Sequence, residues 1–193
     1  MEQLKQLDEL VPMELPGTTP VGERLLDTAS ELFYHRGITA VGVDLISERA
    51  GATKRTLYQR FGSKDGLVAA YLTRRAHRWQ VGLLAALQTA QPARPDDALR
   101  VVFDYSSSWA ADNERGCAFV NAWADVGASD AGAVRIIRAE KEWMARLWQL
   151  LLDDPVLAGQ VQLLHEGAQV AASVLVDEQA FDRAYAAARR LLR

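Results

Sequence analysis

The chain has 193 residues, 49% of them hydrophobic and 24% charged, and a formal net charge of -3 at pH 7. This length holds at most two small domains, and no apolar run approaches the roughly 18 residues that a membrane-spanning helix needs. A single cysteine, Cys117, excludes an internal disulfide framework, and no Cys/His spacing predicts a structural metal or a cofactor. The N-terminus also lacks a signal peptide's basic and apolar regions, so we expect a cytoplasmic protein with no membrane partner.

The charge is unevenly distributed along the chain. Residues 51–78 carry seven Lys or Arg and one Asp, whereas residues 79–193 carry 11 Lys or Arg and 15 Asp or Glu. A basic segment suits a nucleic-acid partner, but an ordinary solvated surface has the same composition. The motif within the basic segment must therefore decide between a nucleic-acid partner and a solvated surface.

Residues 1–19 are predicted to be a flexible tail. Pro12, Pro16 and Gly17 interrupt this segment, and such residues are typical of turns and loops. It holds at most one helical turn, and we assign it no function. The apolar residues of that turn are Leu4, Leu7 and Val11.

Three helices are predicted between Thr19 and Phe61. Thr19 and Pro20 fit the N-cap and the first residue of a helix that Gly37 ends. A short second helix follows over 43–50, and Thr53 caps a third after a tight turn at a glycine.

The rest of the chain continues to show helical periodicity, and no strand is predicted. Ser63 caps a fourth, long helix whose apolar stripe reaches a break at Pro92 and Pro95. The later predicted helices cover 96–111, 117–127, 130–152, 155–176 and 178–192. We therefore predict an all-α fold.

The segment 43–61, VDLISERAGATKRTLYQRF, has helix-turn-helix geometry. Leu57 and Phe61 lie one turn apart and point to the core, so the polar side chains of the third helix face outward. The fork of Arg55 matches guanine O6 and N7, and Gln59 matches adenine N6 and N7, so these two are the predicted base readers. The other predicted DNA-binding residues position the helix on double-stranded DNA. They are Thr39, Thr53, Lys54, Thr56, Tyr58 and Lys64.

The run from Ala50 to Leu67, AGATKRTLYQRFGSKDGL, lies behind a helix ending in Arg36-Gly37. On this run, residues 20–72 resemble the DNA-binding domain of the TetR (tetracycline repressor) family of bacterial regulators. The resemblance implies an all-helical homodimer whose C-terminal domain binds a small effector and releases an operator, usually as a repressor. The expected domains are the tail at 1–19, a three-helix helix-turn-helix domain at 20–66, and a helical effector-binding and dimerisation domain at 67–193.

The chain departs from the family pattern before the second helix. Val41 and Gly42 stand where members typically carry Thr or Ser, so an N-cap and a phosphate-binding hydroxyl are missing, for which Thr39 is the substitute. Asp44 also places an acid near the phosphate surface. The tail is acidic where relatives often have a basic arm, which argues against minor-groove contacts.

Residues 103–148 are unusually aromatic, and the resemblance implies a cavity for a mostly apolar effector among these helices. The alternative is an ordinary core, since a buried helix shows the same stripe. His165 and Asn121 are also candidates, although for His165 the favoured interpretation is a histidine satisfied inside the protein or at an interface. The predicted pocket residues are Phe103, Trp109, Phe119, Asn121, Trp123, Trp143, Trp148 and His165.

The last two helices are rich in small residues, which permit close helix approach. A four-helix dimer interface is the predicted use, chiefly because the resemblance implies it, and packing within one chain is the alternative. The predicted interface residues are Gly159, Gly167, Ala168, Ala171, Ala172, Ala184 and Ala188.

The alternative functions are an enzyme and an effector-independent DNA binder. An enzyme has no support, because Gly17 and Gly22 have phosphate-loop spacing without the following Lys-Ser/Thr, and the three histidines are far apart in sequence. Cys117 fits a buried thiol better than a redox sensor. An architectural or effector-independent DNA binder would have a fully packed C-terminal core without a ligand pocket.

Overall fold

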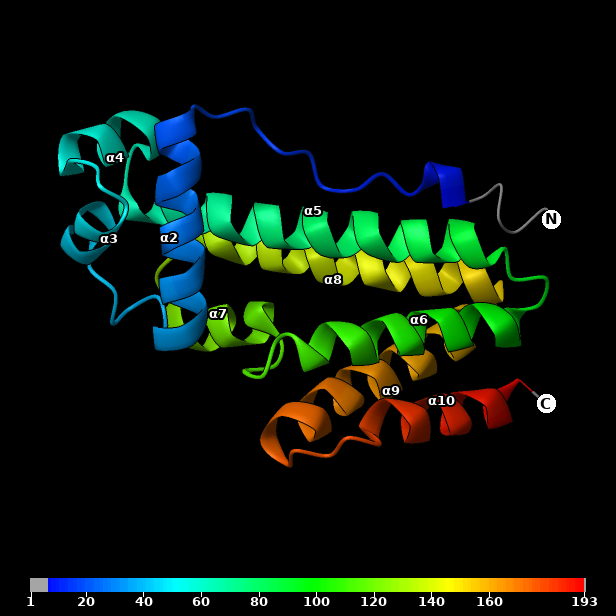
Figure 1. The fold of residues 1–193 in the computed structure, drawn as a ribbon. Coiled ribbons are helices and arrows are strands. Elements are labelled where there is room, and N and C mark those ends of the chain that lie inside the picture. The colour runs from blue at the N-terminus through cyan, green and yellow to red at the C-terminus, as the bar shows by residue number, and fades with distance from the viewer. Residues whose placement is uncertain (1–6, 193) are drawn as a thin grey trace. The chain divides into compact units, whose positions relative to one another are not determined.

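The computed structural model describes residues 7–192. These residues form nine α-helices and one short 3-10 helix and contain no strand, which confirms the predicted all-α fold (Figure 1). The elements are η1 (Leu7–Glu9), α2 (Pro20–Arg36), α3 (Val43–Arg49), α4 (Lys54–Phe61), α5 (Lys64–Ala90), α6 (Pro95–Ala111), α7 (Ala118–Val126), α8 (Ala131–Leu152), α9 (Pro155–Val174) and α10 (Ala180–Leu191).

Local capping signals determine where most of these helices begin. The Thr19 hydroxyl accepts a hydrogen bond from the Gly22 N–H at 3.3 Å, and Pro20 occupies the first turn. At α9 the Asp154 carboxylate accepts hydrogen bonds from the N–H groups of residues 156 and 157. Helix α2 ends at Gly37, whose φ of 87° is readily adopted only by glycine.

The chain folds into two compact units. The helix-turn-helix unit consists of Met13–Arg78 and Ala118–Ala139, and the aromatic unit consists of Trp79–Cys117, Glu140–Arg193 and the beginning of the chain up to Pro12. Helices α5 and α8 therefore contribute residues to both units. The division at residue 66 into a reading domain and an effector domain is a division of functions, and it stays a prediction.

The helix-turn-helix unit has its own core. Helix α2 contacts α3 and α4 (Figure 1). Helices α2, α3, α4 and α5 each contribute a fully buried side chain: Leu25, Ile46, Leu57 and Leu67. Burying a leucine-sized side chain contributes about 1.5 to 3 kcal/mol, so these anchors fix the orientation of the short helices α3 and α4.

The aromatic unit is built around α6, α9 and α10, which pack against one another. Its core continues into α5 and α8, where Leu83, Leu87 and Leu147 are fully buried. Phe103 and Trp148 lie in the same core with their ring centroids 5.9 Å apart.

Residues 7–12, which lie in the predicted tail, are anchored to the aromatic unit. Leu7 and Leu10 are buried in its core, and the Trp143 indole N–H donates to the Val11 carbonyl at 3.0 Å. Val11 itself is exposed. Leu4, the third residue of the expected helical turn, lies outside the described residues. Residues 7–11 therefore have a packing role that the sequence did not indicate.

Candidate nucleic-acid interface

Helices α3 and α4 are held by residues that point inward. Ile46 on α3 and Leu57 on α4 are fully buried, and Ala50 at the turn is nearly so. Gly51 has a φ of 60°, which allows the chain to reverse between the two helices. Because the inner faces are anchored, the outer face of α4 has a defined set of side chains.

That outer face carries polar and cationic groups. Lys54, Arg55, Tyr58, Gln59 and Arg60 are all exposed on α4. Arg55 and Gln59 are separated by four residues, so they share one side of the helix. This arrangement presents two side chains capable of bidentate base contacts next to groups that can donate to phosphates.

Asp44 forms an ion pair with one of these cations. Its carboxylate contacts Lys54 Nζ, and the two side chains are 71% and 55% exposed. An exposed pair of this kind contributes only about 0 to 1 kcal/mol, so a phosphate can compete for the lysine. Without DNA, Asp44 therefore pairs with Lys54, one of the predicted phosphate-contacting residues.

Two threonines organise the start of α4. The Thr53 hydroxyl oxygen accepts a hydrogen bond from the Thr56 N–H at 3.1 Å and lies 2.9 Å from the Thr56 hydroxyl. Thr53 thus caps the helix, as its position after the turn predicted. Both threonines support the helix start directly, whether or not they also contact phosphate.

The start of α5 offers a further cation. The Ser63 hydroxyl accepts a hydrogen bond from the Gly66 N–H at 2.9 Å, and Lys64 is half-buried at the first position of the helix. A lysine beside a helix N-terminus suits a phosphate, because the helix dipole and the ammonium both attract anions.

The turn between α2 and α3 is held by α7, a contact that sequence reasoning missed. One oxygen of Asp125 accepts hydrogen bonds from the N–H groups of Ile38 at 2.5 Å and Thr39 at 3.0 Å, and the Thr39 hydroxyl donates to the Asp125 carbonyl at 3.4 Å. A Cβ on Gly37 would lie 3.2 Å from the same carboxylate. Thr39, the predicted phosphate ligand, therefore already has a partner within its own unit.

The Asp125 carboxyl remains ionised more readily than an ordinary aspartic acid. Partial burial acts to raise its pKa, but hydrogen bonds from Thr39 and Ile38 and the charge of Lys64 outweigh burial and lower it. The turn is thus held by a charged acceptor.

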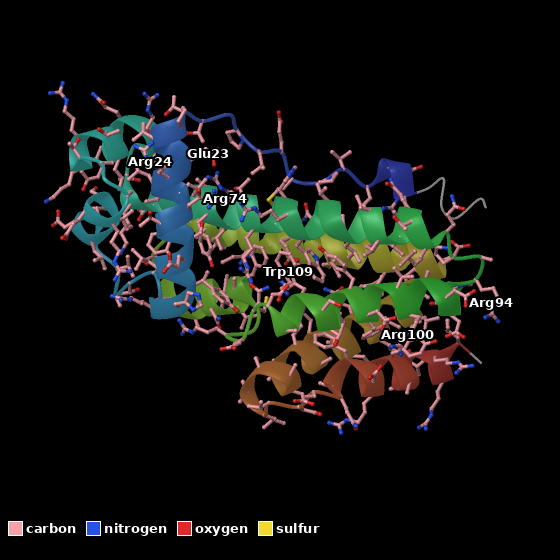
Figure 2. The ribbon with its side chains drawn as sticks, in the orientation of Figure 1. Glu23, Arg24, Arg74, Arg94, Arg100 and Trp109 are labelled. Carbon is pink, nitrogen blue, oxygen red and sulfur yellow. The ribbon has the colours of Figure 1, made fainter. Side chains whose placement is uncertain are left out.

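Not all of the basic segment is available to DNA. Arg74 is buried and donates to Asp27 at 2.7 Å, Glu23 at 3.4 Å, the Leu26 carbonyl and the Ser30 hydroxyl, where it joins α5 to α2 (Figure 2). Arg75, the next residue, lies over the Tyr34 ring at 4.5 Å. The other five cations of the segment are Lys54, Arg55 and Arg60 on α4, Lys64 at the start of α5, and Arg78, which is exposed farther along α5.

The predicted pocket residues are divided between the two units. Phe103, Trp109, Trp143, Trp148 and His165 belong to the aromatic unit, where Trp109 packs on Trp79 with centroids 5.4 Å apart. The other three belong to the helix-turn-helix unit, where Phe119 is buried, Asn121 half-buried and Trp123 exposed with Arg138 over its ring at 5.9 Å.

The predicted interface residues also differ in exposure. Gly159 and Gly167 are exposed on α9, and Ala171 and Ala172 are half-buried. Ala168, Ala184 and Ala188 are buried within one chain, where α9 and α10 pack together.

Comparison with known proteins decides the family. A family model described as bacterial regulatory proteins of the tetR family matches residues 25–71. SCO4454, a TetR-family transcriptional regulator from Streptomyces coelicolor, has a similar structure over 90% of this chain and 94% of its own, with 30% identity and a TM-score of 0.78. The chain belongs to the TetR family. It is a DNA-binding transcriptional regulator rather than an enzyme.

Other TetR-type regulators share the fold or part of the sequence. A TetR transcriptional regulator from Legionella pneumophila covers 92% of this chain and all of its own at 17% identity, with a TM-score of 0.73. FasR of Mycolicibacterium smegmatis, an HTH-type transcriptional activator, is 40% identical over 84 residues. Those residues are 42% of this chain and 38% of FasR, and this TetR-family chain spans 60% of the regulator MT1294 of Mycobacterium tuberculosis. The chain thus spans less than two thirds of these curated relatives.

Within residues 7–192 of this TetR-family protein, no helix has both the length and the apolar character to cross a bilayer. Nor does this part of the chain bring three or more His, Cys, Asp or Glu side chains together as a metal site.

Proposed function

We propose that this TetR-family regulator is a repressor that binds a near-palindromic operator as a homodimer and is released by a small effector. The observation that carries the proposal is the outer face of α4. Arg55 and Gln59 are exposed there, while Leu57 between them is fully buried. Such a helix can enter a major groove with its base-reading side chains already oriented.

An apolar stripe on α9 supports dimerisation. Val156, Leu163, Val170 and Val174 are between 54% and 74% exposed and follow one another at helical spacing. Contiguous exposed apolar residues on a soluble protein mark an interaction surface. A second copy placed symmetrically on this stripe would pair the two α4 helices with two half-sites.

The aromatic unit and α5 support effector control. Phe103, Trp109 and Trp148 supply aromatic surface of the kind that lines small-molecule sites. Helix α5 runs without interruption from Lys64 through Trp79, so it belongs to both units. An effector that prefers one position of this helix would change DNA affinity, with a coupling of about 1 to 3 kcal/mol.

The test begins with selection of bound fragments from genomic DNA by the purified full chain. The recovered operator is then placed before a reporter gene, in cells with and without the regulator. Repression predicts higher expression when the regulator is deleted. Lower expression would instead indicate an activator, the function stated for the relative FasR.

Effector control is tested separately on the same operator. Molecules that raise reporter expression are titrated against the protein–DNA complex, and an effector must weaken operator binding. An effector-independent regulator would bind the operator equally well in the presence of every compound that binds the aromatic unit.

A further inference from the structure

Glu140 on α8 is a buried acid that the DNA-binding site does not use. Its exposed fraction is 4%, and its Oε2 atom has no hydrogen-bond partner among the described residues. A buried ionised carboxylate is unfavourable unless hydrogen bonds and an opposite charge compensate it. A ligand that supplies the missing donor would explain why an acid occupies this position.

The cation beside Glu140 is committed to another acid. Lys141 Nζ donates to both carboxylate oxygens of Glu166, at 2.7 and 2.9 Å, whereas it lies 3.7 Å from Glu140 Oε2. Cys117 Sγ is 3.7 Å from the same nitrogen. Two carboxylates therefore share one ammonium.

The neighbouring histidine does not supply a second positive charge. His165 Nε2 lies 2.9 Å from Ser106 Oγ, and Nδ1 lies 3.3 Å from Gln169 Nε2. Burial, helped by the charge of Lys141, lowers the pKa of His165 to about 3, so the ring is neutral. His165 therefore adds no positive charge to that of the Lys141 ammonium beside the two carboxylates.

Aromatic side chains continue along the same face of α8. Glu140, Met144 and Trp148 are buried and four residues apart, so they share one side of the helix. The Trp79 indole N–H donates to Met144 Sδ at 3.3 Å, and the Trp79 and Tyr105 ring centroids lie 5.1 Å apart. A carboxylate and aromatic ring faces both attract a cation, so together they favour a positively charged ligand with an apolar body.

We propose that the carboxylate of Glu140 binds the positively charged nitrogen of an amphipathic aromatic amine, and that effectors of this regulator belong to this class. The inference rests on the proposed effector control, because it names the chemistry of the molecule that exerts it. An N–H of the ammonium group would donate to Oε2, and the aromatic body would pack on the rings beside Met144.

Binding is linked to a proton. Burial raises the pKa of Glu140 to about 7, against an opposing effect of Lys141 and a further rise from the Glu166 charge. An ammonium ligand prefers the ionised carboxylate, so its affinity should fall about tenfold per pH unit well below pH 7 and level off above it. Cys117, Lys141, Glu166 and His165 are the other titratable groups of this site. Of these, Lys141 and His165 have pKa values displaced away from neutrality.

The experiment uses the full chain and three soluble probes of similar shape: benzylamine, benzyl alcohol and benzoate. Their binding is measured between pH 5.5 and 8.5 by calorimetry and by tryptophan fluorescence. We expect benzylamine to bind at least about tenfold more tightly than the other two, and to lose that advantage at acid pH. Glu140→Gln should abolish the preference and its pH dependence, whereas Glu142→Gln, an exposed acid on the same helix, should change neither.

Several outcomes would overturn the proposal. Equal binding of benzylamine and benzyl alcohol to the wild-type chain would do so without any variant, as would no benzylamine binding at millimolar concentrations. Release of the operator by benzyl alcohol but not by benzylamine would exclude the cationic class and leave effector control intact. If amine binding depends on Glu140 but leaves operator affinity unchanged, aromatic amines are not effectors of this regulator.

Discussion

Arg74 and Glu140 are both buried ionisable side chains, but only Arg74 has a full set of partners. Arg74 donates to two acids, a carbonyl and a hydroxyl of α2, so its charge is compensated and fixes α5 against that helix. Glu140 has an oxygen without a donor and a cation that is shared with Glu166. The free-energy cost of burying a charge is therefore compensated at Arg74 in the helix-turn-helix unit and is not fully compensated at Glu140 in the aromatic unit.

Replacing Glu140 by glutamine should stabilise the protein in mildly alkaline solution. Because burial raises the folded-state pKa of Glu140 from 4.5 to about 7, the folded state keeps a proton that the unfolded chain has lost. Stability from this group is complete below about pH 4.5 and is lost as pH rises to about 7. Glu140→Gln removes that loss, so its free energy of unfolding should exceed the wild-type value by up to about 3 kcal/mol at pH 8.

The measurement is urea unfolding of both proteins from pH 5 to pH 8. The gain from Glu140→Gln should increase through this range, and Glu142→Gln, at an exposed acid of the same helix, is the control. His165, whose low pKa makes stability fall as pH drops below 6.5, is common to all three proteins and cancels. A pH-independent difference for Glu140→Gln would mean that the carboxyl is not abnormally protonated.

Arg55 and Lys64 should have different effects on DNA binding. If Arg55 reads a base through its fork, Arg55→Ala should cost about 1 to 3 kcal/mol on the selected operator and relax one position of the site. Lys64→Ala should weaken operator and random DNA alike and reduce the salt dependence. Fluorescence anisotropy on both DNAs separates the two effects, and equal losses for Arg55→Ala would assign Arg55 to the phosphate backbone instead.

At the scale of helices, α7 belongs to the same unit as α3 and α4, although it is distant from them in sequence. The Asp125 carboxylate holds the N–H groups of residues 38 and 39 in the turn that leads into α3. That turn lacks a side-chain N-cap, since Gly42 occupies the capping position. Asp125 therefore stabilises from outside a segment that is weakly specified by its own residues.

Asp125→Ala should consequently lower stability and operator affinity together. Removing the acceptor deprives two N–H groups of their partner, and because the site is partly exposed to water the cost should be about 1 kcal/mol. Asp125→Asn keeps an acceptor oxygen and should lose less. Thermal unfolding and anisotropy titrations of both variants provide the measurement, with the exposed Glu114→Ala as control. Unchanged stability in Asp125→Ala would show that water replaces the carboxylate without cost.

The helices could be predicted because their signals are local. Thr19-Pro20, Gly37 and Asp154-Pro155 each determine a helix end through neighbouring atoms, and the predicted ends agree with the structure within a few residues. Asp125 could not be assigned, because its partners lie 86 and 87 residues away. Glu140 left a weak signal, since it falls on the buried stripe through Met144 and Trp148.

The aromatic side chains show a different limit of sequence reasoning. Their abundance predicted apolar packing, but composition does not assign each ring to a unit. Trp143 is one of the predicted pocket residues, and its indole N–H donates to the Val11 carbonyl in the segment predicted to be a tail. Only tertiary packing brings residues 132 positions apart together, and no periodic pattern carries that information.

At the scale of the whole molecule, one copy of α4 offers few base-reading side chains to an operator. One helix contacts only a few base pairs, so two copies related by symmetry are needed to read a longer site. Within residues 7–192, the stripe on α9 is an exposed apolar surface whose length and regular spacing suit such a pairing. Half-sites should then lie about 34 to 36 Å apart, or a multiple of that distance.

Leu163→Glu should separate the two copies without unfolding either. Leu163 is 74% exposed in the single chain, so a charge there is harmless to the fold but would be buried without a partner in a dimer, at about 2 to 5 kcal/mol. Light scattering at micromolar concentration should report a dimer for wild type and a monomer for the variant. Val81→Glu, an exposed apolar position on α5, should remain dimeric.

Affinity of Leu163→Glu for the full operator should approach that of wild type for a single half-site, with thermal unfolding still cooperative. A dimeric Leu163→Glu variant that binds the operator normally would place the interface elsewhere, because an unpaired charge cannot be buried twice across a symmetric contact without such a loss.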